Sequence, residues 1–236
     1  MSAARYLIVN ADDLGMSAGV NAGIFHGHEH GIVTSASLMV RQTAAHEAAK
    51  LAGEHPRLAI GLHLDLGQWD YVRGEWIAAY QRCDQEDESA VRAECRSQLQ
   101  AFRSLLGRDP THLDSHQHVH QSEPVASVSA AIAAELGVPL RGWRVRYEGG
   151  FYGQTGKGEP VPQAISPEHL ATLVRALPGG WTELGCHPGT GDTAESSYGR
   201  ERQLELEALC DPLLARVLRE EQVSLRSFAD LGRSER

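Results

Sequence analysis

The chain has 236 residues and a formal net charge of −9, and 42% of its residues are hydrophobic while 22% are charged. This is the composition of a water-soluble globular protein, and the acidic charge disfavours nucleic acid and membrane surfaces as partners. No apolar run approaches the roughly 20 residues that cross a bilayer, and the apolar stretch near the amino terminus is too short for a signal peptide. We therefore expect a cytoplasmic protein.

Short strand-like runs take turns with helical segments along the whole chain. In chain order the expected elements are a strand at 6–10, a helix at 17–31, a strand at 33–40, a helix at 43–54, a strand at 58–66, a helix at 88–106, a strand at 111–115, a helix at 123–136, a strand at 140–146, a helix that begins after Ser166, and strands at 181–186 and 223–226. This alternation predicts parallel βαβ units, either doubly wound or closed into a barrel, and seven strands in one series favour the barrel. We expect one domain over residues 1–236, with two long connections, 67–87 and 147–163, that are candidates for functional loops.

Histidine is the unusual residue type in this chain. The 12 histidines cluster, whereas the four cysteines are scattered without a Cys-x-x-Cys pair. The cysteine spacing predicts neither a structural zinc site nor a disulfide framework. Because histidine is the commonest metal-binding side chain, its clustering directs the search to a metal site.

Two adjacent carboxylates, Asp12 and Asp13, directly follow the first expected strand. Sites in parallel sheets are built where the strands end, and neighbouring residues that leave a strand point in different directions. The pair is therefore suited to two different tasks. An ordinary Asp-Asp turn that caps the next helix is the alternative reading of the same residues.

The third expected strand carries an ionisable face. Strict alternation in 61–66 places His63 and Asp65 on one face of the strand and leucines on the other. A face that simply meets solvent is the alternative interpretation.

The strongest signal lies around the fourth expected strand. Five ionisable residues occupy even positions there: His112, Asp114, His116, His118 and His120. In an extended chain, alternate side chains start about 6.6 Å apart and the ends of this segment lie about 26 Å apart. They therefore cannot all bind one ion, and some must orient the residues that do.

A further histidine, His187, stands at the exit of the expected strand 181–186, followed by a Pro-Gly turn. Strand ends that each offer aspartate or histidine predict one shared site. One aspartate and two histidines leave positions open for water and substrate, which is typical of a catalytic metal site. The chemistry that follows is metal-assisted hydrolysis of a carbonyl or phosphoryl bond.

The longest motifs carry a family resemblance. They read IVNADDLGMS at 8–17, GIVTSASLMV at 31–40, AIGLH at 59–63, PTHLDSHQHVH at 110–120 and CHPG at 186–189. These stretches resemble the YdjC-like family of carbohydrate deacetylases. The resemblance implies a distorted seven-stranded (β/α) TIM-like barrel that removes acetyl groups from N-acetylated sugars, such as chitooligosaccharides, with one divalent metal ion.

The resemblance also implies a role for each matching residue. Asp13, His63 and His116 would be the metal ligands. Asp12 would be the general base and His187 the general acid. Two imidazoles and a carboxylate suit zinc by ligand type, whereas the family is often described with magnesium, so both metals are expected candidates.

Other residues are left with open roles. His118, His120 and Asp114 are expected to orient ligands or face the substrate. Arg144 or Arg146 is a candidate to steer Asp12, and a solvated strand end is the alternative interpretation of these two arginines. Three aromatic residues in the long connections are candidates to stack on a sugar ring: Trp69, Tyr71 and Tyr152. The family resemblance further suggests a homodimer.

Two other functions stay open from the sequence. A metal-dependent phosphoesterase or another amidohydrolase on the same barrel would use similar residues, often with two metal ions. A metal-binding or scaffolding protein without catalysis is the non-enzymatic alternative.

Overall fold

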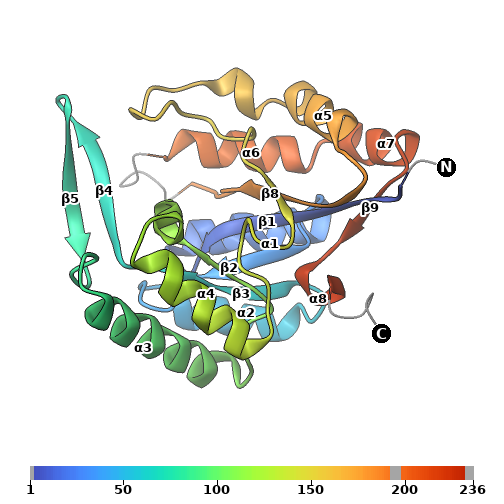
Figure 1. Cartoon of the computed structure of the whole chain (residues 1–236). Helices are drawn as coiled ribbons and strands as arrows, with labels where there is room; N and C mark the ends of the chain where they lie inside the picture. Colours follow the sequence, from blue (N-terminus) through green and yellow to red (C-terminus); the bar gives the residue numbers. More distant parts are fainter. Residues whose placement is uncertain (1–2, 192–197, 232–236) are drawn as a thin grey trace.

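A curled, seven-stranded parallel sheet forms the centre of the fold (Figure 1). The computed structural model describes residues 3–191 and 198–231. The strands of the sheet are β1 (Arg5–Leu14), β2 (Ser35–Leu38), β3 (Ala59–Leu64), β6 (Leu113–Ser115), β7 (Arg146–Glu148), β8 (Gly180–Cys186) and β9 (Val223–Arg226). Their order is β6-β3-β2-β1-β8-β7, β9 pairs with the first part of β1, and all these pairs are parallel.

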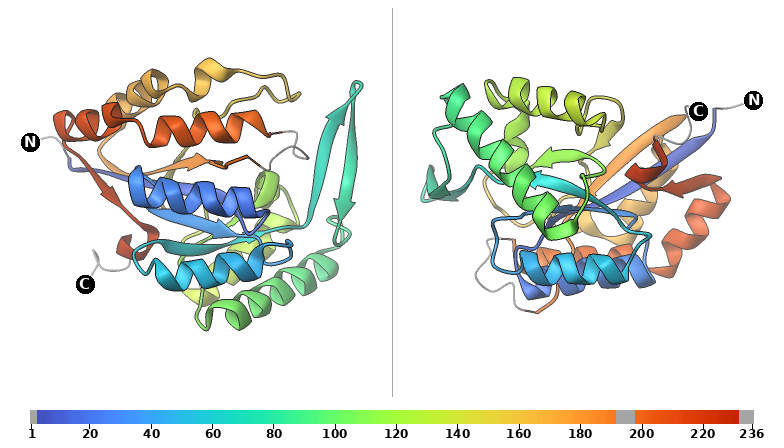
Figure 2. Two further views of the ribbon diagram at one scale, coloured as in Figure 1. Left: turned by 180° about the vertical axis from the view of Figure 1, so that it is seen from behind. Right: turned by 90° about the horizontal axis from the view of Figure 1, so that it is seen from below.

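Helices surround the sheet (Figure 2). They are α1 (Ala18–His30), α2 (Ala45–Glu54), α3 (Glu88–Leu106), α4 (Val125–Leu136), α5 (Pro167–Ala176), α6 (Arg200–Leu209), α7 (Pro212–Glu220) and α8 (Phe228–Leu231). Neighbours contact one another in the order α5, α6, α1, α2, α3 and α4. The predicted α/β class and the distorted TIM-like barrel, here a curled half-barrel, are confirmed. Within 3–191 and 198–231, no helix is both long and apolar enough to cross a membrane.

The expected helix boundaries follow from their capping residues. The Ser17 side chain accepts a hydrogen bond from the Val20 N–H at the start of α1, and Asp87 caps α3 in the same way. Gly107, at a φ of 66°, ends α3 in the left-handed conformation that glycine adopts most easily. No element is predicted between 187 and 222, where the structure has α6 and α7.

Strand β1 places polar groups in the interior. Its residues from Leu7 to Leu14 are all buried, because β1 lies between β8 on one edge and β2 and β9 on the other. A strand buried on both faces is normally apolar throughout. The polar side chains near its carboxyl end therefore need partners within the protein.

The predicted strand 140–146 is wrong in most of its length. At its start, Leu140 forms a single parallel bridge, with Leu113 of β6. Gly142, at a φ of 80°, turns the chain away, and the next strand, β7, begins at Arg146. The segment between Leu140 and β7 thus spans the open side of the half-barrel between β6 and β7.

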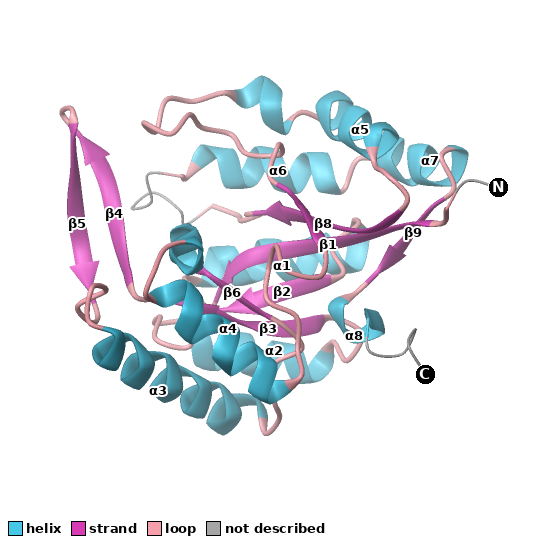
Figure 3. Ribbon diagram, in the orientation of Figure 1, coloured by secondary structure: helices cyan, strands magenta, loops and turns pink. Residues whose placement is uncertain are grey.

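The predicted long loop 67–87 contains a β-hairpin instead. Strands β4 (Gly67–Val72) and β5 (Glu75–Gln81) pair antiparallel and project away from the barrel (Figure 3). Arg73 and Gly74 both have positive φ, as two-residue hairpin turns require. The other long connection, 147–163, is mostly irregular, as expected.

The extended geometry expected for 112–120 is also wrong after Ser115. The chain turns there into a 3₁₀ helix, η1 (His116–Gln121), in which Gln117 and His118 have φ values of 50° and 54°. Left-handed backbone at two consecutive non-glycine residues is costly and is found mostly at functional sites. The turn therefore separates His116 from His118 and His120.

Candidate metal centre

Three predicted ligands meet at the carboxyl ends of neighbouring strands. Asp13 comes from β1, His63 from β3 and His116 from the turn after β6, and their ligand atoms all lie within 4.8 Å of one another. Asp13 Oδ1 is 3.4 Å from His63 Nε2 and 3.1 Å from His116 Nδ1. The arrangement offers one carboxylate oxygen and two imidazole nitrogens to a single point.

A second carboxylate orients the His63 imidazole. The His63 Nδ1–H donates to Asp114 Oδ1 at 2.8 Å, which leaves Nε2 directed toward Asp13. Burial alone lowers the pKa of His63, but the Asp114 and Asp13 carboxylates outweigh burial and raise this pKa to about 10. The site therefore favours a positive charge at His63, and a carboxylate behind a metal-binding histidine is the usual second partner at metal sites.

The His116 imidazole is held from the hairpin. Its Nδ1 faces Asp13 Oδ1, and its Nε2 lies 3.2 Å from Gln68 Oε1 on β4. When Nε2–H donates to Gln68, the lone pair of Nδ1 remains free for a cation.

Asp13 is turned into the site by its backbone. Its φ of 66° is unusual for a residue that is not glycine. Arg202 of α6 donates to Asp13 Oδ2 at 2.6 Å. Burial raises the pKa of Asp13, but Arg202 and His116 hold this pKa well below its ordinary value, so Asp13 is a carboxylate at neutral pH.

Asp12 points elsewhere, to a buried arginine that the sequence analysis does not single out. Arg141 donates to both Asp12 oxygens, at 2.6 and 2.7 Å. The same guanidinium lies 2.9 Å from Asp114 Oδ2 and 2.7 Å from Glu183 Oε1. Burial raises the pKa of Asp12, but Arg141 more than offsets this and lowers it.

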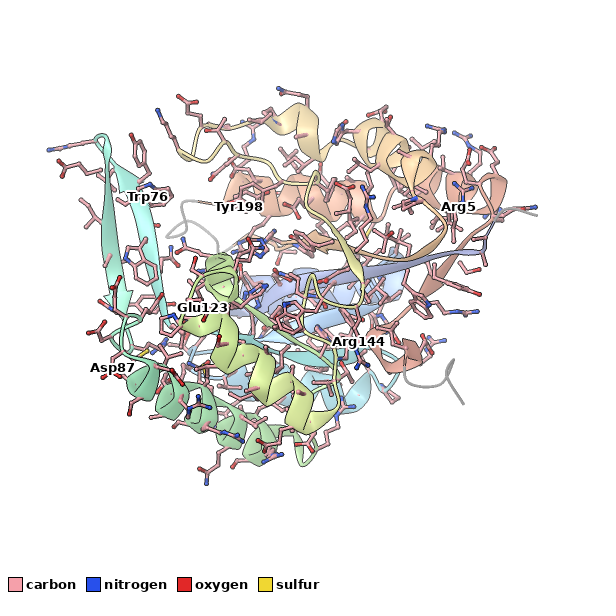
Figure 4. The ribbon with its side chains drawn as sticks, viewed as in Figure 1. Arg5, Trp76, Asp87, Glu123, Arg144 and Tyr198 are labelled. Carbon is pink, nitrogen blue, oxygen red and sulfur yellow. The ribbon has the colours of Figure 1, made fainter. Side chains whose placement is uncertain are left out.

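The expectation that Arg144 or Arg146 steers Asp12 is therefore wrong. Both side chains are exposed (Figure 4 labels Arg144), whereas Arg141 is 2% exposed. No local signal in the sequence points to Arg141. The predicted strand 140–146 places it near a strand start, whereas in the structure it directly follows Leu140, which bridges to β6.

His187 lies on the other side of Asp12. Its Nε2 is 3.9 Å from Asp12 Oδ2, and its Nδ1 is 3.9 Å from Glu205 Oε1 of α6. Glu205 also accepts hydrogen bonds from the His187 backbone N–H and the Tyr198 hydroxyl. Burial lowers the pKa of His187 to about 4 and raises the pKa of Glu205 to about 8.

All five predicted site residues line one cavity of about 1030 Å³: Asp12, Asp13, His63, His116 and His187. The three aromatic candidates, Trp69, Tyr71 and Tyr152, line it as well, and so does His118.

Three of the polar residues at even positions of 112–120 do not line the cavity and contact other side chains instead. Asp114 lies behind His63. His112 is buried, stacks on Phe228 and lies 3.1 Å from the Ser37 hydroxyl. His120 Nδ1 lies 2.6 Å from the Ser115 hydroxyl.

Asp13, His63 and His116 form a group that could hold a metal ion. A second group of possible ligands, Asp12, His63 and Asp114, also lies close together. Arg141 already forms ion pairs with Asp12 and Asp114, so in that group the arginine side chain supplies the positive charge that a metal ion would otherwise supply. Two imidazoles and one carboxylate suit zinc, and an oxygen-rich shell completed by water would suit magnesium.

A carboxylate and two imidazoles at the carboxyl ends of parallel barrel strands are the arrangement that single-metal hydrolases use. The model of YdjC-like proteins matches residues 6–220, and the chain therefore belongs to the YdjC-like family.

Relatives of known name cover almost the whole chain. A chitooligosaccharide deacetylase of Serratia marcescens is 33% identical, over 96% of this chain and 99% of that protein. A carbohydrate deacetylase of Geobacillus stearothermophilus is 34% identical, over 96% and 98%.

Solved structures share the fold. One from Enterococcus faecalis, provisionally named a cellobiose-phosphate cleavage protein, is 26% identical with a TM-score of 0.80 and covers 97% of this chain and 99% of that one. A family 4 carbohydrate esterase of Streptomyces lividans has a TM-score of 0.58 at 13% identity and covers 95% and 93%, which shows a likeness of fold alone.

Proposed function

We propose that the chain is a metal-dependent carbohydrate N-deacetylase that releases acetate from N-acetylated sugars of the chitooligosaccharide type. The observation that carries the proposal is the shared cavity. This cavity is lined by the three possible metal ligands. It is also lined by Asp12, which Arg141 holds in place, and by His187, which lies between Asp12 and Glu205. The names of the relatives from Serratia and Geobacillus support the same reaction.

Asp13, His63 and His116 would hold the cation, which would polarise the acetyl carbonyl and acidify a water molecule. Asp12 accepts the proton of the attacking water. Arg141 keeps Asp12 ionised and in place, so this base is ready before the substrate arrives.

His187 protonates the departing nitrogen, since an amide nitrogen leaves poorly without a proton. Its low pKa makes it neutral in the resting protein, so the proton must reach it during the reaction. One carboxyl group lies near each of its ring nitrogens, Asp12 at Nε2 and Glu205 at Nδ1, and either supplies the proton.

The proposal also covers the metal ion, the substrate, the cellular location and the oligomeric state. We propose one zinc or magnesium ion and a small-molecule sugar as the partner. A cytoplasmic location is supported by the four cysteines, which are all free thiols, as in reducing compartments. The homodimer stays a prediction, which light scattering tests.

The test measures acetate release from N-acetylated mono- and oligosaccharides, with and without a chelator and with zinc or magnesium restored. We expect metal-dependent release that is lost in Asp13→Ala and Asp12→Asn. Asp109→Asn, which changes an exposed aspartate paired with Arg103, is the matched control and keeps activity. Phosphorylated sugars belong in the same panel, because of the name of the Enterococcus protein. Phosphate release without acetate release would replace the proposal with the phosphoesterase alternative.

A further inference from the structure

The β4–β5 hairpin exposes large apolar side chains that nothing in the described structure covers. Five large hydrophobic residues of the described ranges are exposed, and three of them lie on the hairpin: Val72, Trp76 and Ile77. Trp76 is 59% exposed. Clustered exposed apolar groups mark binding surfaces more often than isolated ones do.

One face of the hairpin is aromatic. Tyr71 pairs with Trp76 across the two strands, and Trp69 pairs with Ala78, so these side chains lie on the same face. The Tyr71 and Trp76 rings are 5.5 Å apart, edge to face. We call Trp69, Tyr71 and Trp76 the aromatic face, and all three line the cavity that contains Asp12.

The hairpin is anchored at its base, so the aromatic face has a defined place. Asp65, which follows β3 and is fully buried, accepts hydrogen bonds from the Tyr80 hydroxyl at 2.9 Å and from Arg82 at 2.7 and 2.9 Å. The Gln117 side chain accepts from the Trp69 N–H and donates to the Trp69 carbonyl, at 3.0 and 2.8 Å. Because Gln117 adjoins His116, a proposed metal ligand, these two hydrogen bonds link the Trp69 backbone to the reaction centre.

A second aromatic wall stands near the proposed acid. The rings of Tyr152 and Tyr198 stack 4.7 Å apart, and each lies 5.5 Å from the His187 ring. Figure 4 shows Tyr198 across from Trp76, and both line the cavity. A volume of about 1030 Å³ lies at the upper end of the range for small-molecule pockets, which leaves room beyond the ring that carries the reacting acetyl group.

We propose that the aromatic face is a distal subsite that holds a second sugar ring of an N-acetylated oligosaccharide. This inference rests on the proposed function and extends it from the reacting ring to its neighbour. The C–H face of a pyranose is apolar and packs on aromatic rings, while its hydroxyl groups remain at the edge. Lys157, in a loop that lines the same cavity, is suited to those hydroxyl groups.

The test compares binding of N-acetylglucosamine and its trimer by calorimetry, in full-length, zinc-loaded protein that carries Asp12→Asn to prevent turnover. We expect the trimer to bind about tenfold more tightly than the monomer. We expect the added Trp76→Ala substitution to lower the trimer-to-monomer affinity ratio to near one. Trp76→Phe retains a ring and should give an intermediate ratio. Trp143→Ala is the matched control, because Trp143 is 66% exposed but is not among the described residues that line the cavity; this variant keeps the full ratio.

Three outcomes separate this subsite from its rivals. An unchanged trimer-to-monomer ratio in Trp76→Ala overturns the proposal. A Trp76→Ala protein that loses self-association in light scattering, with the ratio unchanged, makes the hairpin a contact between copies of the chain and also overturns it. A ratio that depends on Trp76, together with no acetate release by the unmodified protein, supports the subsite and overturns the deacetylase function.

Discussion

Arg141 donates hydrogen bonds to both carboxylate oxygens of Asp12, at 2.6 and 2.7 Å, and the two side chains form a buried bidentate ion pair. The same guanidinium contacts Asp114, the residue that orients His63. One side chain therefore fixes the proposed base and supports a proposed metal ligand. Since bidentate geometry is what distinguishes arginine from lysine, this contact is open to a sharp test.

Arg141→Lys keeps the positive charge but cannot bind both oxygens of Asp12. We expect acetate release to fall about 100-fold, the lower end of what a positioned acid or base contributes. Arg141→Met leaves buried carboxylates without a cation and is expected to lower the free energy of unfolding by about 3–5 kcal/mol. Turnover assays and urea unfolding measure the two effects, with the exposed Arg144→Lys as control. A Lys variant with the activity of the unmodified protein would show that Arg141 is not needed to position Asp12.

Asp114→Asn tests whether the carboxylate that orients His63 contributes to metal affinity, because the substitution changes none of the proposed ligands. The substitution removes the negative charge that accepts the His63 Nδ1–H. Partners of this kind contribute about 10- to 100-fold in metal affinity, and we expect a loss of that size for zinc. Competition with a chromophoric chelator at fixed pH measures it, and Asp109→Asn is the control. Equal zinc affinity in both variants would refute the role of Asp114.

Buried histidines make the fold sensitive to acid. Burial lowers the pKa of His112 and His120 to about 4, with nearby Asp114 and Arg141 acting in opposite directions. In the unfolded chain histidine protonates near pH 6.5, so below that pH the unfolded state binds more protons than the folded state. Each histidine therefore contributes stability that is fully present above about pH 6.5 and decreases as the pH falls toward 4, by about 1.4 kcal/mol per pH unit.

Urea unfolding between pH 7.5 and 4.5 measures this effect. His112→Gln should flatten the pH dependence, whereas His46→Gln, on the exposed side of α2, should leave it unchanged. The same slope in His112→Gln and in the unmodified protein would contradict the assignment.

Gly23 tests how α1 positions the turn after β8. A Cβ at Gly23 would lie 2.4 Å from the Gly189 Cα, two residues beyond His187. Because that contact is with backbone, Gly23→Ala must displace the turn, and we expect a loss of stability of about 1–3 kcal/mol with a drop in turnover. Gly53→Ala in α2 meets no atom within 4 Å and should be neutral or stabilising by up to about 1 kcal/mol. Melting temperature and acetate release distinguish the two variants, and similar behaviour of both would disprove the close contact.

A shared site of aspartates and histidines follows from the sequence because these residues stand at or near the ends of short apolar strands, whereas the choice of Asp13, His63 and His116 as ligands comes from the family resemblance. Carboxyl ends of parallel strands meet at one edge, so strand order hardly matters for this prediction. The extended geometry predicted beyond Ser115 is wrong because alternation cannot reveal a turn at Gln117 and His118, where the backbone becomes left-handed.

The buried charges could not be predicted in this way. Arg202 and Glu205 lie in a stretch rich in charge for which no element is predicted, yet the structure has helix α6 there and both side chains are buried. Their partners lie elsewhere in the chain, and Arg202 is 189 residues from Asp13. Arg141 likewise meets Asp12 across 129 residues. Local patterns carry no information on such pairings.

The position of helix α6 in the sequence determines when the reaction centre is completed during folding. It supplies Arg202 to Asp13 and Glu205 to His187, so one helix holds both sides of the reaction centre. Asp13 precedes Arg202 by 189 residues in the chain and is therefore synthesised before it. Contacts of such long range form slowly. While the residues between them are synthesised, the nascent chain carries Asp13 without the arginine that pairs with it, and the packing of α6 against the barrel completes the site.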